Sequence, residues 1–140
     1  KILYTYLLFF LKEKNMKPFF ELRIYRVNPG MMKEWVNLME KVIIPFQVSK
    51  GVVINGSFIE KSIDIFSLSD GSRQMDRKED RNAYIWIRRF ESEEQKESLY
   101  KDVYESEEWI NNIGPKVAKL IDRNSMVIHN LYSTDLSIIK

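Results

Sequence analysis

The chain has 140 residues, of which 44% are hydrophobic and 30% are charged, a size and composition typical of one globular domain. This composition excludes a disordered, collagen-like or integral membrane protein. A formal net charge of +2 is too small to indicate a nucleic-acid partner. The chain has no cysteine and one histidine, which excludes disulfides, thiolate nucleophiles and the usual zinc sites. We therefore expect no metal and no cofactor.

Residues 1–15 differ in composition from the rest of the chain. They are drawn almost entirely from Phe, Tyr, Ile, Asn, Lys and Leu, and the first methionine is Met16. We interpret residues 1–15 as a non-native or disordered extension and Met16 as the natural start. The alternative is a signal peptide, but no small-residue cleavage site follows the apolar run. That run is also shorter than the roughly 20 residues of a membrane span.

The first half of the remaining chain predicts a strand followed by a helix. Phe19–Val27 alternates apolar and polar residues, the period of a strand. Residues 28–30 (Asn-Pro-Gly) indicate a turn. Apolar residues then recur at helical spacing over residues 32–46, and Pro45 is expected to kink or end this helix.

Two further strands are predicted over residues 52–61 and 84–90, where β-branched and aromatic residues are frequent. Gly56 indicates a bulge or a close backbone approach within the first of them. The intervening residues 62–81 are interpreted as an insertion. It could be a lid over a pocket, but a solvated, mobile hairpin loop is favoured because most connecting segments are of that kind.

The second half predicts a capped helix and a final strand. Residues 92–95 (Ser-Glu-Glu-Gln) form a capping-box pattern, and an apolar stripe follows over residues 99–104. Residues 106–108 could cap a second helical segment, which Gly114-Pro115 should break or kink. The last strand is expected at residues 125–132.

The resulting order is β-α-β-β-α-β, which predicts an α+β, ferredoxin-like sandwich over residues 16–135, with a tail at residues 136–140. In this fold both helices cover one sheet face. We expect Leu22 and Ile24 to face the helices. The opposite, open face would then carry large aromatics and arginines, which are typical of an interface or a ligand pocket. These candidate pocket or dimer-face residues are Glu21, Arg23, Tyr25, Tyr84, Trp86, Arg88 and Phe90.

Two short motifs resemble those of the NIPSNAP family. The segment FELRIYRVNPG (residues 20–30) resembles the family's opening motif. IRRFES (residues 87–92), followed by YESEEW (residues 104–109), resembles its second motif. The resemblance covers roughly residues 19–132 and implies a dimeric α/β barrel with no agreed catalytic residues. We therefore expect a homodimer whose two sheets face each other.

Single side chains offer little chemistry. His129 is the one residue whose unperturbed pKa lies near neutral, but a strand histidine pointing into or beside the core is the favoured interpretation. Arg23, Tyr25 and Arg88 could bind an anion or polarise a carbonyl. The favoured alternative is that Glu21 neutralises the arginines, because buried charges must be paired.

Two functions remain open. The first is a homodimeric module, of uncharacterised molecular function, that binds a small apolar or aromatic molecule or serves as an interaction surface. The second is a cofactor-independent enzyme, similar to a monooxygenase or an isomerase, acting on a small apolar or aromatic substrate. A cytoplasmic location, a bacterial source and no membrane partner are the accompanying expectations.

Overall fold

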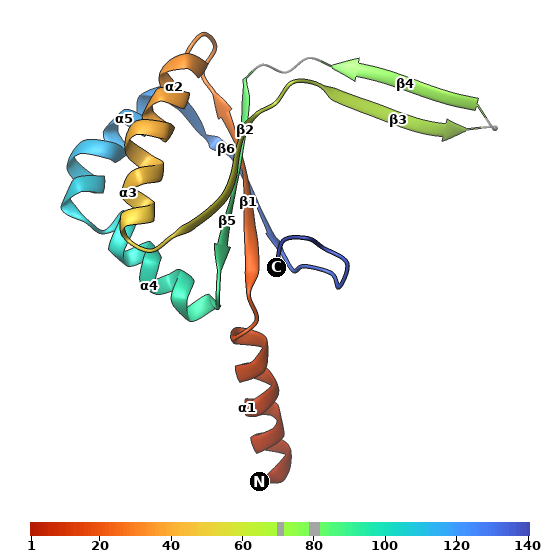
Figure 1. The fold of residues 1–140 in the computed structure, drawn as a ribbon, viewed down its shortest axis with the longest axis vertical. Coiled ribbons are helices and arrows are strands. Elements are labelled where there is room, and N and C mark those ends of the chain that lie inside the picture. The colour runs from red at the N-terminus through yellow and green to blue at the C-terminus, as the bar shows by residue number, and fades with distance from the viewer. Residues whose placement is uncertain (70–71, 79–81) are drawn as a thin grey trace.

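The computed structural model describes residues 1–69, 72–78 and 82–140, with the side chains of residues 12–15 and 65–78 left undescribed. Within these ranges a four-stranded antiparallel sheet has the order β2-β5-β1-β6. The helices that connect its strands all lie on one face (Figure 1). The strands of this sheet are β1 (Phe19–Val27), β2 (Val53–Ile59), β5 (Ala83–Phe90) and β6 (Ile121–Leu131).

This strand order confirms the ferredoxin-like fold. The two outer strands each follow a helical layer, and the two central strands, β1 and β5, pair along their whole length. The helices of the first half precede β2, and those of the second half precede β6. They are α2 (Met32–Leu38), η1 (Met39–Ile43) and α3 (Ile44–Ser49), and then α4 (Glu93–Tyr104), η2 (Trp109–Ile113) and α5 (Gly114–Leu120).

Each half of the domain contains one turn of π-helix, η1 or η2, where a kink was predicted. A proline follows each turn, Pro45 in α3 and Pro115 in α5. Proline lacks an N–H, and its ring clashes with the carbonyl four residues earlier in a regular α-helix. The wider π-turn, with bonds spanning five residues, lets the helical path continue where regular geometry would break.

Other predicted local features are also present. Ser92 Oγ accepts from the Gln95 N–H at 3.1 Å, and Gln95 Oε1 accepts from the Glu91 N–H at 2.7 Å. At Gly56 the pairing of β2 with β5 shifts register. A Cβ added at Gly56 would lie 2.5 Å from the Phe58 ring, so the expected bulge and the close approach are both observed.

The predicted assignment of sheet faces is wrong. The side chains at 21, 23, 25, 84, 86, 88 and 90 are buried beneath the helices instead of lying on the open face. Trp35 of α2 packs edge-to-face on both Tyr25 and Tyr84, with ring centroids 5.8 Å apart in each pair. The physical reason is that the helices supply matching aromatic and polar groups, which alternation along a strand cannot reveal.

The centre of the open face is instead apolar. Leu22 pairs with Ile87 and Ile24 with Ile85 across the central strands, and directly opposed residues point to the same side of a sheet. Phe58 and Val127, on the outer strands, join the same face and are 52% and 45% exposed. At one end of this face the C-terminal tail folds back, and Arg89 donates a hydrogen bond to the Lys140 carbonyl.

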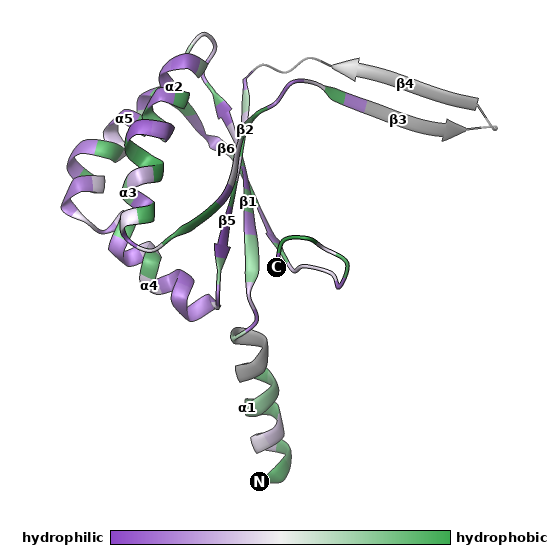
Figure 2. Cartoon of the chain, viewed as in Figure 1, coloured by the Kyte–Doolittle hydropathy of each residue, from purple (hydrophilic) through white to green (hydrophobic). Residues whose placement is uncertain are grey.

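Two elements extend away from this domain (Figure 1). Helix α1 (Ile2–Asn15) exposes a run of large apolar side chains over residues 2–11, which Figure 2 shows as hydrophobic colour along the helix. The interpretation of residues 1–15 as a non-native or disordered extension stays a prediction. Strands β3 (Ile63–Ser69) and β4 (Ser72–Lys78) form a separate antiparallel hairpin within the predicted insertion, part of which lies outside the described residues.

Candidate functional site

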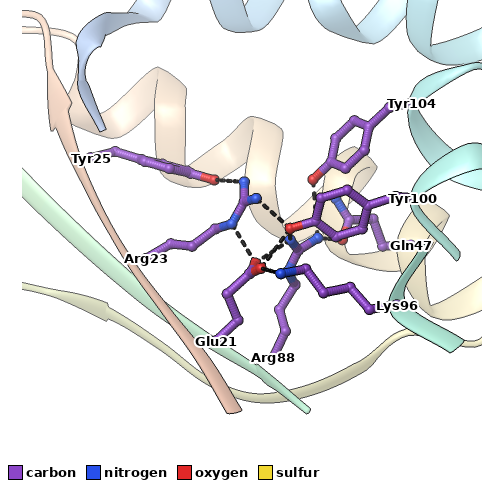
Figure 3. Close-up of polar contacts among 8 residues, drawn as sticks. All are labelled: Glu21, Arg23, Tyr25, Gln47, Arg88, Lys96, Tyr100 and Tyr104. Atoms are coloured by element: carbon purple, nitrogen blue, oxygen red, sulfur yellow. Dashed lines mark hydrogen bonds and ion pairs between the residues drawn. The ribbon is translucent and has the colours of Figure 1, made fainter. Parts of the chain in front are cut away.

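A group of polar side chains is buried between the sheet and the helices (Figure 3). We call it the Glu21 cluster. Strands β1 and β5 supply four of its members, α3 supplies one, and α4 supplies three at a spacing of four residues, which places these three on one helix face. The members are Glu21, Arg23 and Tyr25 of β1, Arg88 of β5, Gln47 of α3, and Lys96, Tyr100 and Tyr104 of α4.

The Glu21 carboxylate is the centre of the cluster and is fully buried. Its Oε1 accepts from Arg23 Nε at 2.6 Å and from Arg88. Its Oε2 accepts from the Tyr100 hydroxyl at 2.6 Å and lies 3.0 Å from Lys96 Nζ. One carboxylate thus faces three cationic side chains.

Ionisation of Glu21 is strongly favoured by these neighbours. Burial alone raises the pKa of the carboxyl, but Arg88, Arg23 and the Tyr100 hydrogen bond outweigh it and lower the pKa to about 2. Burial raises the pKa of Tyr100, Tyr25 and Tyr84, so these phenols keep their protons. At neutral pH the cluster therefore contains the Glu21 carboxylate and the neutral phenols of Tyr25 and Tyr100.

Arg88 is 1% exposed and is held mainly by tyrosines and an amide. Its Nη1 donates to Gln47 Oε1 at 2.9 Å and to the Tyr104 hydroxyl at 3.0 Å, and its Nη2 donates to the Tyr100 hydroxyl at 2.8 Å. The guanidinium also lies 4.9 Å from the centre of the Trp86 ring. Contacts on so many sides fix Arg88 as part of the internal framework.

A cavity of about 310 Å³ lies beside the cluster and reaches the surface near β6, at the small end of the range for small-molecule sites. We call it the tryptophan cavity. Its polar lining includes Arg23, Tyr25 and Tyr104, and its mouth is near Arg123 and Met126. Aromatic and aliphatic side chains from the helices and the sheet form most of its wall, among them Trp35, Met39, Ile43, Trp86, Trp109 and Val117.

Both π-turns contribute to this cavity. Met39 and Ile43 of η1 and Trp109 of η2 belong to its lining. Trp109 also packs edge-to-face on Tyr104, with ring centroids 4.7 Å apart. Turns of π-helix are frequent at functional sites because they re-aim side chains within a helix.

The structure separates the seven predicted strand residues into three groups. Arg23, Tyr25 and Trp86 line the tryptophan cavity, whereas Glu21 and Arg88 lie behind it in the polar cluster. Tyr84 and Phe90 serve packing. The Tyr84 hydroxyl bonds Ser57, and Phe90 belongs to a second apolar cluster with Phe19, Val52, Leu99 and Val103.

His129 lies away from this site. It pairs with Leu22 on the open face and is exposed, so it points neither into the core nor toward the cavity. The favoured interpretation, a histidine in or beside the core, is therefore wrong, because the helices cover the other face of the sheet.

Sequence reasoning missed the helical half of the site. Lys96, Tyr100 and Tyr104 recur every four residues, which would have indicated a polar and aromatic stripe facing inward. Gln47 carries no such signal, because a single glutamine in an apolar helix face does not reveal a buried arginine opposite. Among the residues that the structure describes, no group of three acidic, histidine or cysteine side chains could hold a metal ion.

Comparison with known proteins gives similarity in structure alone. No protein-family model matches the chain, and no curated protein does. A NIPSNAP family protein from Agrobacterium tumefaciens superposes on this chain with a TM-score of 0.64 and 23% sequence identity. The superposition covers 86% of this chain and 90% of that protein's chain. The chain has the fold of NIPSNAP family proteins.

Two further NIPSNAP structures agree. One, from Burkholderia xenovorans, is an uncharacterised protein with a NIPSNAP-like domain. It has a TM-score of 0.66 and 17% identity, over 87% of this chain and 90% of its own. The other, a NIPSNAP family protein of unknown function from A. tumefaciens, has a TM-score of 0.68 and 18% identity. That match covers 89% of this chain and 96% of the other. Finally, none of the helices within the described ranges has the length and apolar character to cross a membrane.

Proposed function

We propose that this chain is a NIPSNAP-like, homodimeric α/β-barrel protein that binds a small apolar or aromatic molecule in the tryptophan cavity. The observation that carries the proposal is the cavity itself. It combines a mostly apolar, aromatic wall with a few fixed polar groups at one end, the arrangement common to small-molecule sites. A bacterial, cytoplasmic protein remains the expectation from the sequence.

The homodimer is supported by the apolar open face. A sheet face lined by Leu22, Ile24, Ile85 and Ile87 and flanked by exposed Phe58 resembles the inside of a sandwich more than a solvated surface. The partner that matches it is a second copy of the same face, because a two-fold interface pairs identical patches.

Binding is favoured over catalysis by the state of Glu21. With a pKa of about 2 and four partners, this carboxylate is a weak base that is already occupied, whereas a general base works best with a pKa near the operating pH. The second candidate, a cofactor-independent enzyme, is supported by the donors of Arg23, Tyr25 and Tyr104, which could stabilise developing negative charge.

Native mass spectrometry and a fluorescence titration test the proposal. The purified full chain should be dimeric, and 2-naphthamide, a neutral aromatic probe, should quench tryptophan fluorescence in a saturable way. Met126→Trp, at the partly exposed cavity mouth, should abolish saturation. Val48→Trp is the matched control, because Val48 is 51% exposed and is absent from the cavity lining. A probe that binds the Met126→Trp variant equally well would contradict the assignment.

A further inference from the structure

The polar groups that line the tryptophan cavity offer more hydrogen-bond donors than the described residues have acceptors for. Arg23 carries five N–H groups. Its Nε donates to Glu21. Nη1 donates one of its hydrogens to the Tyr25 hydroxyl at 2.9 Å, and Nη2 donates one to the Tyr100 hydroxyl at 2.6 Å. The second hydrogen on each terminal nitrogen has no acceptor among the described residues.

Two tyrosine hydroxyls at the same end also have a proton to donate. Tyr25 accepts from Arg23, and Tyr104 accepts from Arg88 at 3.0 Å. In each hydroxyl the oxygen is therefore engaged as an acceptor, while its own O–H has no partner among the described side chains. Both residues line the cavity together with Arg23.

Buried indole groups extend the imbalance. Trp35 Nε1 and Trp86 Nε1 are buried without a hydrogen-bond partner in the described part of the chain, and both residues line the cavity. A buried donor without an acceptor costs about 1–3 kcal/mol. An occupant that brings acceptors suits this surplus of donors, whereas one that brings more donors would add to it.

The charge of the cluster also favours an occupant that brings acceptors. Arg23, Arg88 and Lys96 converge on Glu21 as the one carboxylate of the cluster, so positive charge remains in excess. Lys96 is partly exposed and can be solvated, but Arg88 and Arg23 are buried. Arg23 is the one of these two that reaches the cavity.

We propose that the occupant is an aromatic or apolar carboxylate. Its two oxygens accept from Arg23 and from the Tyr25 and Tyr104 hydroxyls, and its apolar body lies against the tryptophans toward the mouth. The inference rests on the proposed binding function and adds the chemical class of the ligand. Arg23 is suited to this role because a guanidinium presents parallel donors to a carboxylate.

A matched pair of ligands tests the carboxylate. We expect 2-naphthoate to bind the dimer at least about 10-fold more tightly than 2-naphthamide at pH 7.5, because charge-assisted hydrogen bonds are roughly twice as strong as neutral ones. Isothermal titration calorimetry measures both. Equal affinity would overturn the carboxylate but leave the cavity as a binding site, whereas binding of neither ligand would overturn both proposals.

Two conservative variants test the residues. Tyr104→Phe and Tyr25→Phe each remove one hydroxyl and should lower the preference for 2-naphthoate about 3- to 10-fold, with little change for 2-naphthamide. Tyr84→Phe is the matched control, because its hydroxyl bonds Ser57 and is absent from the cavity lining. A preference that survives in both cavity variants, or that falls equally in Tyr84→Phe, would overturn the assignment. Circular dichroism confirms that each variant is folded.

Discussion

Arg88 and Glu21 lie directly opposite each other on adjacent antiparallel strands, and the Arg88 guanidinium donates to the Glu21 carboxylate beneath the helices. Both side chains are almost completely removed from solvent. Desolvating two charges is costly, so such a pair persists only where further hydrogen bonds satisfy its remaining atoms. Here Gln47, Tyr100 and Tyr104 provide them for the terminal nitrogens of Arg88 and for Glu21, whereas Arg88 Nε is buried without a hydrogen-bond partner among the described residues.

Removing one member of this pair should strongly destabilise the fold. We expect Arg88→Met to lower the free energy of unfolding by about 3–5 kcal/mol, because Glu21 would lose its most buried partner. Lys96→Met, at the partly exposed end of the same cluster, should cost no more than about 1 kcal/mol. Chemical denaturation of both variants measures the difference, and equal losses would contradict the framework role of Arg88.

Acid should weaken the fold through Glu21. Because its native pKa lies near 2, below its ordinary value of 4.5, the unfolded chain binds this proton first. The stabilisation is therefore complete above pH 4.5 and is lost as the pH falls toward 2. The loss reaches at most about 3–4 kcal/mol, since a pKa difference of one corresponds to about 1.4 kcal/mol. Denaturation midpoints measured between pH 7 and pH 2 follow this loss.

The control for the acid experiment is Glu91→Gln. Glu91 is exposed and forms a surface ion pair with Arg89, so its removal should leave the slope of stability against pH almost unchanged. A protein whose stability stays constant down to pH 2 would show that the pKa of Glu21 is not lowered.

The N-terminus of α4 depends on Ser92. Its extended backbone and its bond to the Gln95 N–H are those of a helix cap. We expect Ser92→Ala to lower the free energy of unfolding by about 1 kcal/mol, because one amide at the helix start loses its acceptor. Ser92→Gly should cost less, and thermal denaturation of the two variants compares them. A loss below the error of measurement would contradict the cap.

A charge placed on the open sheet face should prevent dimerisation. Ile85→Glu puts a carboxylate beside Ile24 at the centre of that face, where an interface would desolvate it. We expect monomers by light scattering at micromolar concentration. Val48→Glu, an equal change at an exposed position on the helical side, should leave the dimer intact. A monomeric unmodified protein would contradict the homodimer.

The sequence carries the order and type of the elements but not the side of the sheet that the helices cover. Alternation in Phe19–Val27 separates Leu22 and Ile24 from Glu21, Arg23 and Tyr25, and this separation is correct. Which set faces inward depends on what the helices offer to it. Tyr100 and Tyr104 offer hydroxyls and Gln47 offers an amide. The Glu21 carboxylate and the terminal nitrogens of Arg88 are therefore hydrogen-bonded on the face where aliphatic residues were expected.

The site was predictable to the same extent. Arg23, Tyr25 and Trp86, which line the cavity from β1 and β5, were among the candidates because large aromatics with arginine are typical of an interface or a ligand pocket. The lining residues of β6, Ile121, Arg123 and Met126, were not predicted. The cavity itself depends on helix packing, and in particular on Trp35 and Trp109, whose positions follow from tertiary contacts that one sequence does not display.

The π-turn η1 determines how the end of its helix is oriented. One extra residue in a helical turn rotates everything after it by about 100° around the helix axis. If a single residue between Met39 and Ile43 were deleted, Gln47 would swing away from Arg88 while the helix itself could stay intact. The number of residues in this turn, more than the identity of any of them, therefore keeps Gln47 on the side of the helix that faces Arg88.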